Sequence, residues 1–263
     1  MKRVVKRRIR DGVLYAVLAG VIIAAIAFAD WGTIHSNFFN WGIVKQLWPD
    51  LVTTAAVNTI KYTAIAFAGG LVLALVLALM RLSPIPPYRW ISTVYIEVFR
   101  GLPALVTIIL FGFGFSLAFG WNPPGGVVGA GLLALVVTYS AYMAETLRAG
   151  LQAVPAGQLE AARSLGMGGL HTMASVQLPQ AIRIVVPPLT NEFVLLLKDT
   201  ALISVLGMQY NQVDLTQFGR NNLTTYVSPT PLIAVAAVYL VISIPLTQLV
   251  AWLERRQQRA VAR

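Results

Sequence analysis

The chain has 263 residues, of which 57% are hydrophobic and 11% are charged, and its formal net charge is +10. A soluble domain carries about 25% charged residues, so the composition argues against a soluble enzyme, a coiled coil and a disordered chain. The sequence has no cysteine and two histidines, His35 and His171. It therefore excludes a disulfide framework and a cysteine zinc site, and it disfavours a histidine metal cluster.

Six stretches have about the length and apolar character of a transmembrane helix, which needs about 20 residues. In chain order they are residues 13–29, 52–80, 91–119, 127–147, 181–206 and 230–252. The fifth stretch contains Pro187 and Pro188. Adjacent prolines interrupt helical hydrogen bonding, so we expect a broken helix buried among the others. The sequence predicts an all-α polytopic membrane bundle of about six transmembrane helices.

The distribution of Lys and Arg predicts the orientation of these helices. Fifteen of the 20 basic residues lie on one predicted side: six before residue 13, two within 81–89, three within 148–183 and four after residue 254. Cytoplasmic loops carry the excess of Lys and Arg, so we expect both termini in the cytoplasm. The first stretch also resembles a signal peptide with Ala27-Phe28-Ala29 as a cleavage site, but its apolar run is long for that role. We expect an uncleaved span.

Charged residues inside membrane spans are candidates for function. Glu97 and Arg100 are three residues apart, so they share a helix face and could pair, and the following Gly101 and Pro103 suggest a bend or a close helix contact. Alternatively, Arg100 lies at the cytoplasmic interface and reaches water. A second group either lines a path for a hydrophilic solute or holds the broken helix by a salt bridge. Its members are Asn191, Glu192, Lys198 and Asp199.

Two further features concern packing and the long connector. Gly125 and Gly129 have the spacing that permits close helix packing. Residues 148–179 are too polar to span a membrane, yet Gln158–Leu165 is a run of good helix formers with Gly166 as a stop signal and Pro155 just before it. We interpret this segment either as a short cytoplasmic docking helix or as a solvated amphipathic connector.

The connector carries a resemblance to a known family. Glu160-Ala161-Ala162, followed by Gly166 and by Leu178-Pro179, resembles the EAA signature of ABC importer permeases. Further blocks resemble the polar amino acid branch, of the histidine/glutamine/glutamate type; they are residues 99–103, 141–145, 157–166, 178–183, 187–191 and 196–200. The resemblance covers residues 51–254. Leu102 and Ala201 depart from it, because they stand where Thr and Ser are usual.

The resemblance implies a type I importer core of five helices within 51–254, with residues 1–50 as a basic N-terminus, first helix and outer loop, and 255–263 as a basic tail. It implies a bacterial inner-membrane permease subunit that dimerises with a second permease. Two ATPase subunits would bind ATP and Mg²⁺, and an extracytoplasmic binding protein would deliver an amino acid. The implied coupling residues in the 158–168 helix and after it are Glu160, Ala161, Ala162, Gly166, Leu178 and Pro179.

The residues themselves agree with a subunit without catalysis of its own. A nucleotide phosphate loop needs a Gly-Lys pair, and the sequence contains none. We also expect no metal, no cofactor in this chain and no nucleic acid partner, because the basic residues flank membrane spans. Two other classes remain as alternatives. A secondary transporter would need an ion-coupling site and often has internal repeats, and a membrane enzyme would need a catalytic constellation.

Overall fold

The computed structural model describes residues 2–120 and 123–261, and every regular element within them is helical. The all-α prediction is therefore confirmed. In chain order the elements are α1 (Lys2–Phe28), α2 (Trp31–Phe38), α3 (Trp41–Asp50), η1 (a π-helix, Leu51–Ala56), α4 (Val57–Leu82), α5 (Pro86–Gly101), α6 (Ala104–Ile109), η2 (a π-helix, Leu110–Gly114), α7 (Phe115–Phe119), α8 (Gly126–Gln152), α9 (Ala156–Ser164), α10 (Gly169–Thr172), η3 (a π-helix, Met173–Gln177), α11 (Leu178–Asp199), η4 (a 3₁₀-helix, Thr200–Leu206), η5 (a 3₁₀-helix, Tyr210–Gln212), α12 (Leu215–Tyr226) and α13 (Thr230–Val261).

Local sequence signals begin several of these helices. Asp30 and Asn40 accept hydrogen bonds from the first backbone amides of α2 and α3, and Asp214 does the same for α12. Each satisfies a donor that the helix itself leaves free. Proline occupies the first turn of α5, where its missing amide costs no helical hydrogen bond.

Four described helical segments are long and apolar enough to cross a membrane: Arg10–Phe28, Trp31–Leu82, Gly126–Gln152 and Thr230–Gln257. A fifth is possible if α5 and the α6–η2 segment form one span, but the two are bent by 105° at a break between Gly101 and Ala104. The predicted span over 91–119 is therefore two helices, which form one membrane span only as a broken pair, and the bend suggested by Gly101 and Pro103 is confirmed. Leu102 and Pro103 are both extended, and Pro103 is the N-cap of α6.

The predicted span 181–206 differs most from the expectation. α11 continues through Pro187 and Pro188 to Asp199, and the chain becomes a 3₁₀-helix only at Thr200. The predicted break at the prolines is wrong, because packing of α11 against α8 and α13 overrides the local cost of proline. α11 is less apolar than the four segments above, so by length and composition the described residues hold four candidate spans, or five with the bent pair.

The centre of the bundle is the pair α4 and α8, which lie beside each other along much of their length. Gly69 permits this close approach, since a Cβ there would lie 2.9 Å from Val136 Cγ2. Buried small and large side chains alternate across the contact, including Ala66, Ala134 and Met143. α6, α11 and η4 complete this core.

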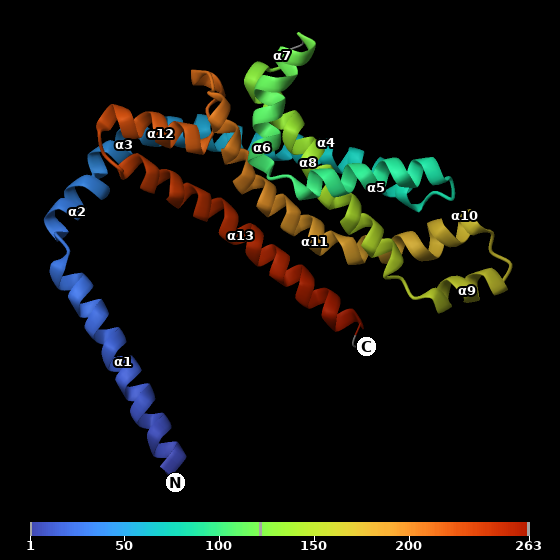
Figure 1. Ribbon diagram of the computed structural model, residues 1–263, viewed down its shortest axis with the longest axis horizontal. Helices are drawn as coiled ribbons and strands as arrows, with labels where there is room; N and C mark the ends of the chain where they lie inside the picture. The colour runs from blue at the N-terminus through green and yellow to red at the C-terminus, as the bar shows by residue number, and fades with distance from the viewer. Residues whose placement is uncertain (1, 121–122, 262–263) are drawn as a thin grey trace.

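A second core lies at one end of the molecule, where α3, η1, α12 and the first half of α13 meet around Leu51 and Leu215. We call this the cap end; α9 and α10 project at the opposite end, the connector end (Figure 1). The turn before α13 is tied to the end of α2, because Ser228 Oγ and Thr230 Oγ1 both donate to the carbonyl oxygen of Asn37, at 2.6 and 2.9 Å. α1 points away from the bundle (Figure 1), and the Arg10–Phe28 segment buries none of its residues in this chain.

The predicted helix-packing role of Gly125 and Gly129 is wrong. Gly125 has a φ of +90° just before α8, and a Cβ on Gly129 would lie 1.9 Å from the carbonyl oxygen of Pro124. The two glycines therefore close a turn within their own segment. The close contacts between helices use other glycines, such as Gly69 in α4 and Gly150 in α8.

Candidate functional site

The connector between α8 and α11 forms a short helix, as predicted. α9 spans Ala156–Ser164 after Pro155, and Gly166 follows with a φ of +82° that favours glycine. Glu160 and Ala161 are exposed, whereas Ala162 is buried against the rest of the chain. Only one of the two predicted contact alanines therefore faces outward, and the other fixes α9 to its own subunit.

Apolar side chains protrude beside the glycine turn. Leu165 and Leu170 are 85% and 86% exposed, and they flank Gly166 in sequence. Leu178 and Pro179 are also exposed and occupy the first turn of α11. Exposed apolar side chains grouped on a surface mark an interaction site. The connector end thus presents a glutamate and several apolar groups to a partner.

A polar cluster lies between α8 and the last turns of α11. Tyr139 Oη donates a hydrogen bond to Asp199 Oδ2 at 2.9 Å, and Tyr139 also interacts electrostatically with Glu192 and Tyr142. Glu192 and Asp199 are seven residues apart, so they lie on the same face of the helix two turns apart. Tyr139 is buried at the base of this cluster.

Arg100 brings the end of α5 to the same cluster. Its guanidinium carbon lies 5.8 Å from the ring centre of Tyr142, and Tyr142 Oη donates to the Arg100 carbonyl oxygen at 3.2 Å. The positive charge of Arg100 also acts on Glu192. One cation and two carboxylates therefore gather around two tyrosines, an arrangement that suits a zwitterionic solute.

The remaining predicted residues lie apart from this cluster. Glu97 forms an ion pair with Arg81, with 3.8 Å between Nη2 and Oε1. Within the described residues it therefore pairs with α4 and not with the expected Arg100. Asn191 and Lys198 are exposed on a neighbouring face of α11. Their spacing of seven residues places them on one side of the helix.

The sequence interpretation missed Glu145, a carboxylate that forms ion pairs with two arginines. Glu145 in α8 accepts hydrogen bonds from Arg81 Nη1 at 2.6 Å, from Arg148 Nε at 3.1 Å and from Arg148 Nη2. From the sequence, the two arginines indicate only topology. The signal that could have revealed the site is the i, i+3 spacing of Glu145 and Arg148 at the end of an apolar span.

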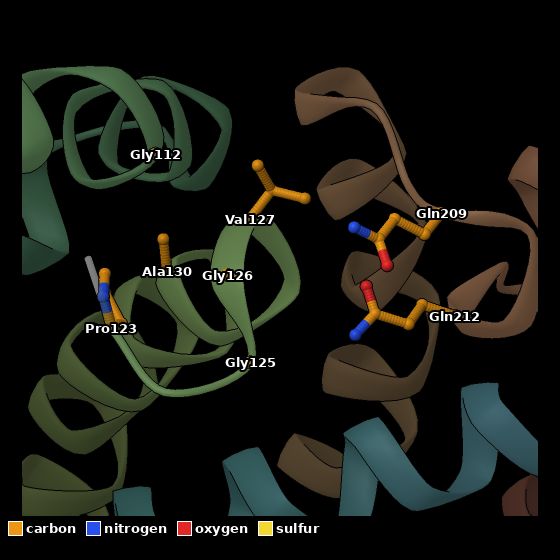
Figure 2. Close-up of a pocket in the computed structure, with 8 residues that line it drawn as sticks. All are labelled: Gly112, Pro123, Gly125, Gly126, Val127, Ala130, Gln209 and Gln212. Atoms are coloured by element: carbon orange, nitrogen blue, oxygen red, sulfur yellow. The ribbon is translucent and has the colours of Figure 1, made fainter.

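A cavity of about 380 Å³ lies at the other end of α8. Its walls come from η2, the start of α8 and the loop before α12; the lining residues are Gly112, Pro123, Gly125, Gly126, Val127, Ala130, Gln209 and Gln212. The side-chain amides of Gln209 and Gln212 point toward each other across one side of it (Figure 2). The cavity is neutral and does not include the candidate path residues.

The loop that contributes these glutamines is held from α4. Asn58 Nδ2 donates to the carbonyl oxygens of Asn211 and Val213, at 3.2 and 3.0 Å, and Tyr62 Oη donates to that of Gln212 at 2.8 Å. Asp214 follows and is fully buried, and burial raises its pKa to about 6. Hydrogen bonds from backbone amides, including that of Gln217, oppose this rise.

Comparison with known proteins assigns the chain to a family. The family described as "Binding-protein-dependent transport system inner membrane component" matches residues 70–259. The chain belongs to this family. It is 39% identical over 206 residues to the probable glutamine ABC transporter permease protein GlnM of Bacillus subtilis, a match covering 77% of this chain and 91% of that protein. It is 34% identical over 241 residues to the arginine transport system permease protein ArgU of Corynebacterium glutamicum, covering 86% and 75% of the two chains.

The solved structures agree with this family. "Crystal structure of an amino acid ABC transporter with histidines" superposes with a TM-score of 0.75 at 39% identity and covers 82% of this chain and 98% of that one. A bacterial transporter for alginate shares the fold at 14% identity, with a TM-score of 0.58 and 98% of this chain covered. The resemblance to amino acid ABC permeases and the type I importer fold are thus confirmed.

Proposed function

We propose that this protein is the permease subunit of an ATP-driven importer for polar amino acids in a bacterial inner membrane. Two such subunits, identical or homologous, would form the path. The proposal is supported by the names of the relatives and, above all, by the connector end, which carries Glu160 on an exposed helix beside a glycine turn. A membrane chain without a phosphate loop needs such a surface to receive energy from another protein.

The energy source in this proposal is a pair of ATPase subunits, which would bind ATP and Mg²⁺. Glu160, Ala161 and the exposed Leu178 and Pro179 would contact the ATPase surface, while Ala162 holds α9 against the permease. Gly166 would let the chain reverse direction without strain, because its φ is positive. An extracytoplasmic binding protein would deliver the amino acid to the cap end.

The polar cluster between α5, α8 and α11 is the proposed site of solute passage. An α-amino acid carries one positive and one negative group, and the cluster offers Arg100 to the carboxylate and Glu192 or Asp199 to the ammonium group. Lys198 and Asn191 lie on the adjoining exposed face, where a second subunit would complete the path. Glu97 pairs with Arg81 in α4, so the proposal assigns it to pairing between helices and leaves it out of the path.

The proposed mechanism is alternating access. Nucleotide binding would bring the two ATPase subunits together, and each α9 would move with the subunit that it contacts. Packed helices respond by rigid-body motion and not by continuous deformation. The α4–α8–α11 core would therefore rotate as one body and expose the polar cluster first to the outside and then to the cytoplasm.

Uptake of labelled glutamine and arginine by the complete importer in proteoliposomes tests both parts of the proposal. Glu160→Ala should lower uptake and transport-coupled ATPase activity by about tenfold, within the range of typical coupling effects. Asp199→Asn should raise the KM for uptake and leave ATPase activity without substrate unchanged. Glu254→Ala, an exposed glutamate in α13, is the matched control and should behave as wild type.

Two results would contradict the proposal. Unchanged uptake in Glu160→Ala would remove the coupling role of α9. Flux of either amino acid through vesicles that contain this chain without any ATPase would favour a secondary transporter or channel.

A further inference from the structure

A line of polar contacts, joined in places only by short backbone segments, runs from α4 through α8 to the connector. It begins at Arg81 in the last turn of α4, whose Nη1 donates to Glu145 Oε2 at 2.6 Å. Arg148 donates to both oxygens of the same carboxylate. The three side chains are only 20%, 23% and 24% exposed, in chain order. Charge-assisted hydrogen bonds of this kind are directional and stronger than neutral ones.

The line continues past the end of α8. Arg148 Nη1 donates to Gln152 Oε1 on the last residue of the helix. One residue earlier, the Leu151 carbonyl oxygen accepts from Gln177 Nε2 at 3.0 Å. The last carbonyls of a helix have no partner within it, and here a side chain from the far end of the connector supplies one.

The final step reaches α9 itself. Gln180 Nε2 donates to Gln158 Oε1 at 2.7 Å and to the Val176 carbonyl oxygen at 3.0 Å. Gln158 lies in the first turn of α9, two residues before Glu160. The exposed connector helix is thus fastened to the first turn of α11 by a side-chain hydrogen bond, in addition to the buried Ala162.

The contact between α4 and the end of α8 depends on the Glu145 carboxylate. If its charge is removed, Arg81 and Arg148 face each other without a shared counter-charge, and like charges at short range repel. The other described carboxylate beside Arg81 is Glu97, which lies at 3.8 Å and whose side chain is 64% exposed. Screening by water makes that contact weak, so it cannot substitute for Glu145.

We propose that Glu145 is a positioning residue that fixes the inner ends of α4 and α8 to each other and thereby holds the connector in a set orientation. This inference rests on the proposed function. A force applied to α9 would then turn the α4–α8 core, and would not be absorbed by bending at the 153–155 link. The hydrogen bonds of Glu145 go to Arg81 and Arg148, and the charge of Arg100 in the proposed path acts on it without a hydrogen bond.

The test uses the complete importer in proteoliposomes, with whichever of labelled glutamine or arginine the wild type accumulates. Glu145→Gln should lower the number of molecules transported per ATP hydrolysed by about fivefold or more, at the lower end of typical coupling effects. ATPase activity without substrate should stay unchanged, which a general loss of structure would not allow. Glu97→Gln removes the weak partner of the same arginine and should keep the wild-type ratio.

A second measurement addresses the orientation directly. Spin labels at the exposed positions Leu82 and Leu165 report the distance between the end of α4 and the connector. The distance distribution should broaden in Glu145→Gln and stay narrow in Glu97→Gln. If Glu145→Gln fails to assemble, Arg81→Gln is the second variant, because it leaves the Glu145–Arg148 pair intact and removes the contact of α4 with Glu145. It should show the same lower transport ratio and the same broader distance distribution.

A wild-type transport ratio with a narrow distance distribution, in whichever of these two variants assembles, would overturn the positioning role. Absence of ATP-dependent uptake by the wild-type importer would instead contradict the proposed function. The spin-label comparison can still be made in that case, because it does not depend on transport.

Discussion

Asp214 should make the stability of the protein depend on pH, and Asp214→Asn should remove that dependence. The side chain is fully buried at the start of α12. Its Oδ1 accepts from the Gln217 amide at 2.7 Å, whereas Oδ2 has no hydrogen-bond partner among the described residues. Burial of a carboxylate that is only half satisfied disfavours its charged form, and its pKa rises from 3.8 to about 6.

The sign of the effect follows from which state holds the proton. Between pH 3.8 and pH 6 the folded protein binds more protons at Asp214 than the unfolded chain does. The contribution of Asp214 to the free energy of unfolding is therefore fully present at low pH and is lost as pH rises through 6. A pKa difference of about 2 corresponds to roughly 3 kcal/mol, of which roughly 2 kcal/mol is lost between about pH 4.5 and 7.5.

Thermal unfolding of the purified protein in detergent measures this loss. Asn keeps the cap acceptor of Asp214 and removes the charge. The Tm of the variant relative to wild type should therefore rise by about 4 °C or more between about pH 4.5 and 7.5, at about 2 °C for each kcal/mol. Comparing the two proteins at each pH cancels the contributions of all other titrating groups.

The matched control is Asp30→Asn, which alters another cap aspartate. Hydrogen bonds from Thr33 lower the pKa of Asp30, which is fully exposed. Its contribution is present above pH 3.8 and is lost only as pH falls through that lowered pKa, so it should be constant from about pH 4.5 to 7.5. An equal Tm difference between Asp214→Asn and wild type at both pH values would refute the reasoning from the buried charge.

Two predictions concern backbone geometry. A Cβ on Gly150 would lie 2.0 Å from Val185 Cγ1 across the α8–α11 contact, so Gly150→Ala should lower stability by about 1–3 kcal/mol. Adding Val185→Ala should restore part of the lost Tm, and no restoration would show that the clash is not the cause. Val227, which follows α12, has a φ of +49°. Val227→Gly should increase the free energy of unfolding by about 1 kcal/mol, and so raise the Tm, because glycine adopts this conformation freely. A lower Tm would contradict that expectation.

The sequence was sufficient to predict the elements whose causes are local. Apolar runs of membrane length predicted α4, α8 and α13. Pro155 and Gly166 predicted the two ends of the connector helix, which the structure places at Ala156–Ser164. Caps, prolines and glycines act within a few residues, so they can be interpreted without knowledge of the fold. The EAA block lies on that helix, and the relatives confirm the family that it indicates.

The partners of charged residues could not be predicted in the same way. Glu97 and Arg100 share a helix face, yet Glu97 pairs with Arg81 on another helix and Arg100 lies over Tyr142. Sequence spacing determines which side chains share a face, but the packing of other helices determines which charges come within reach. The same limit concealed the contact of Glu145 with Arg81, which lies 64 residues earlier in α4, whereas Arg148 is three residues away in the same helix.

The two ends of the bundle are held by different chemistry, and the difference bears on how the protein could move. At the connector end, charged side chains such as Arg81 and Glu145 bridge helices. At the cap end, neutral side chains such as Asn58 and Tyr62 donate to carbonyl oxygens of the 211–213 loop. Neutral bonds to backbone do not depend on the salt concentration, and ion pairs whose side chains are only 20% and 23% exposed are screened by salt less than exposed pairs are. In the proposed mechanism, a motion that begins at α9 would therefore pass through ion pairs that persist in salt, while neutral bonds hold the loop beside the cap-end cavity.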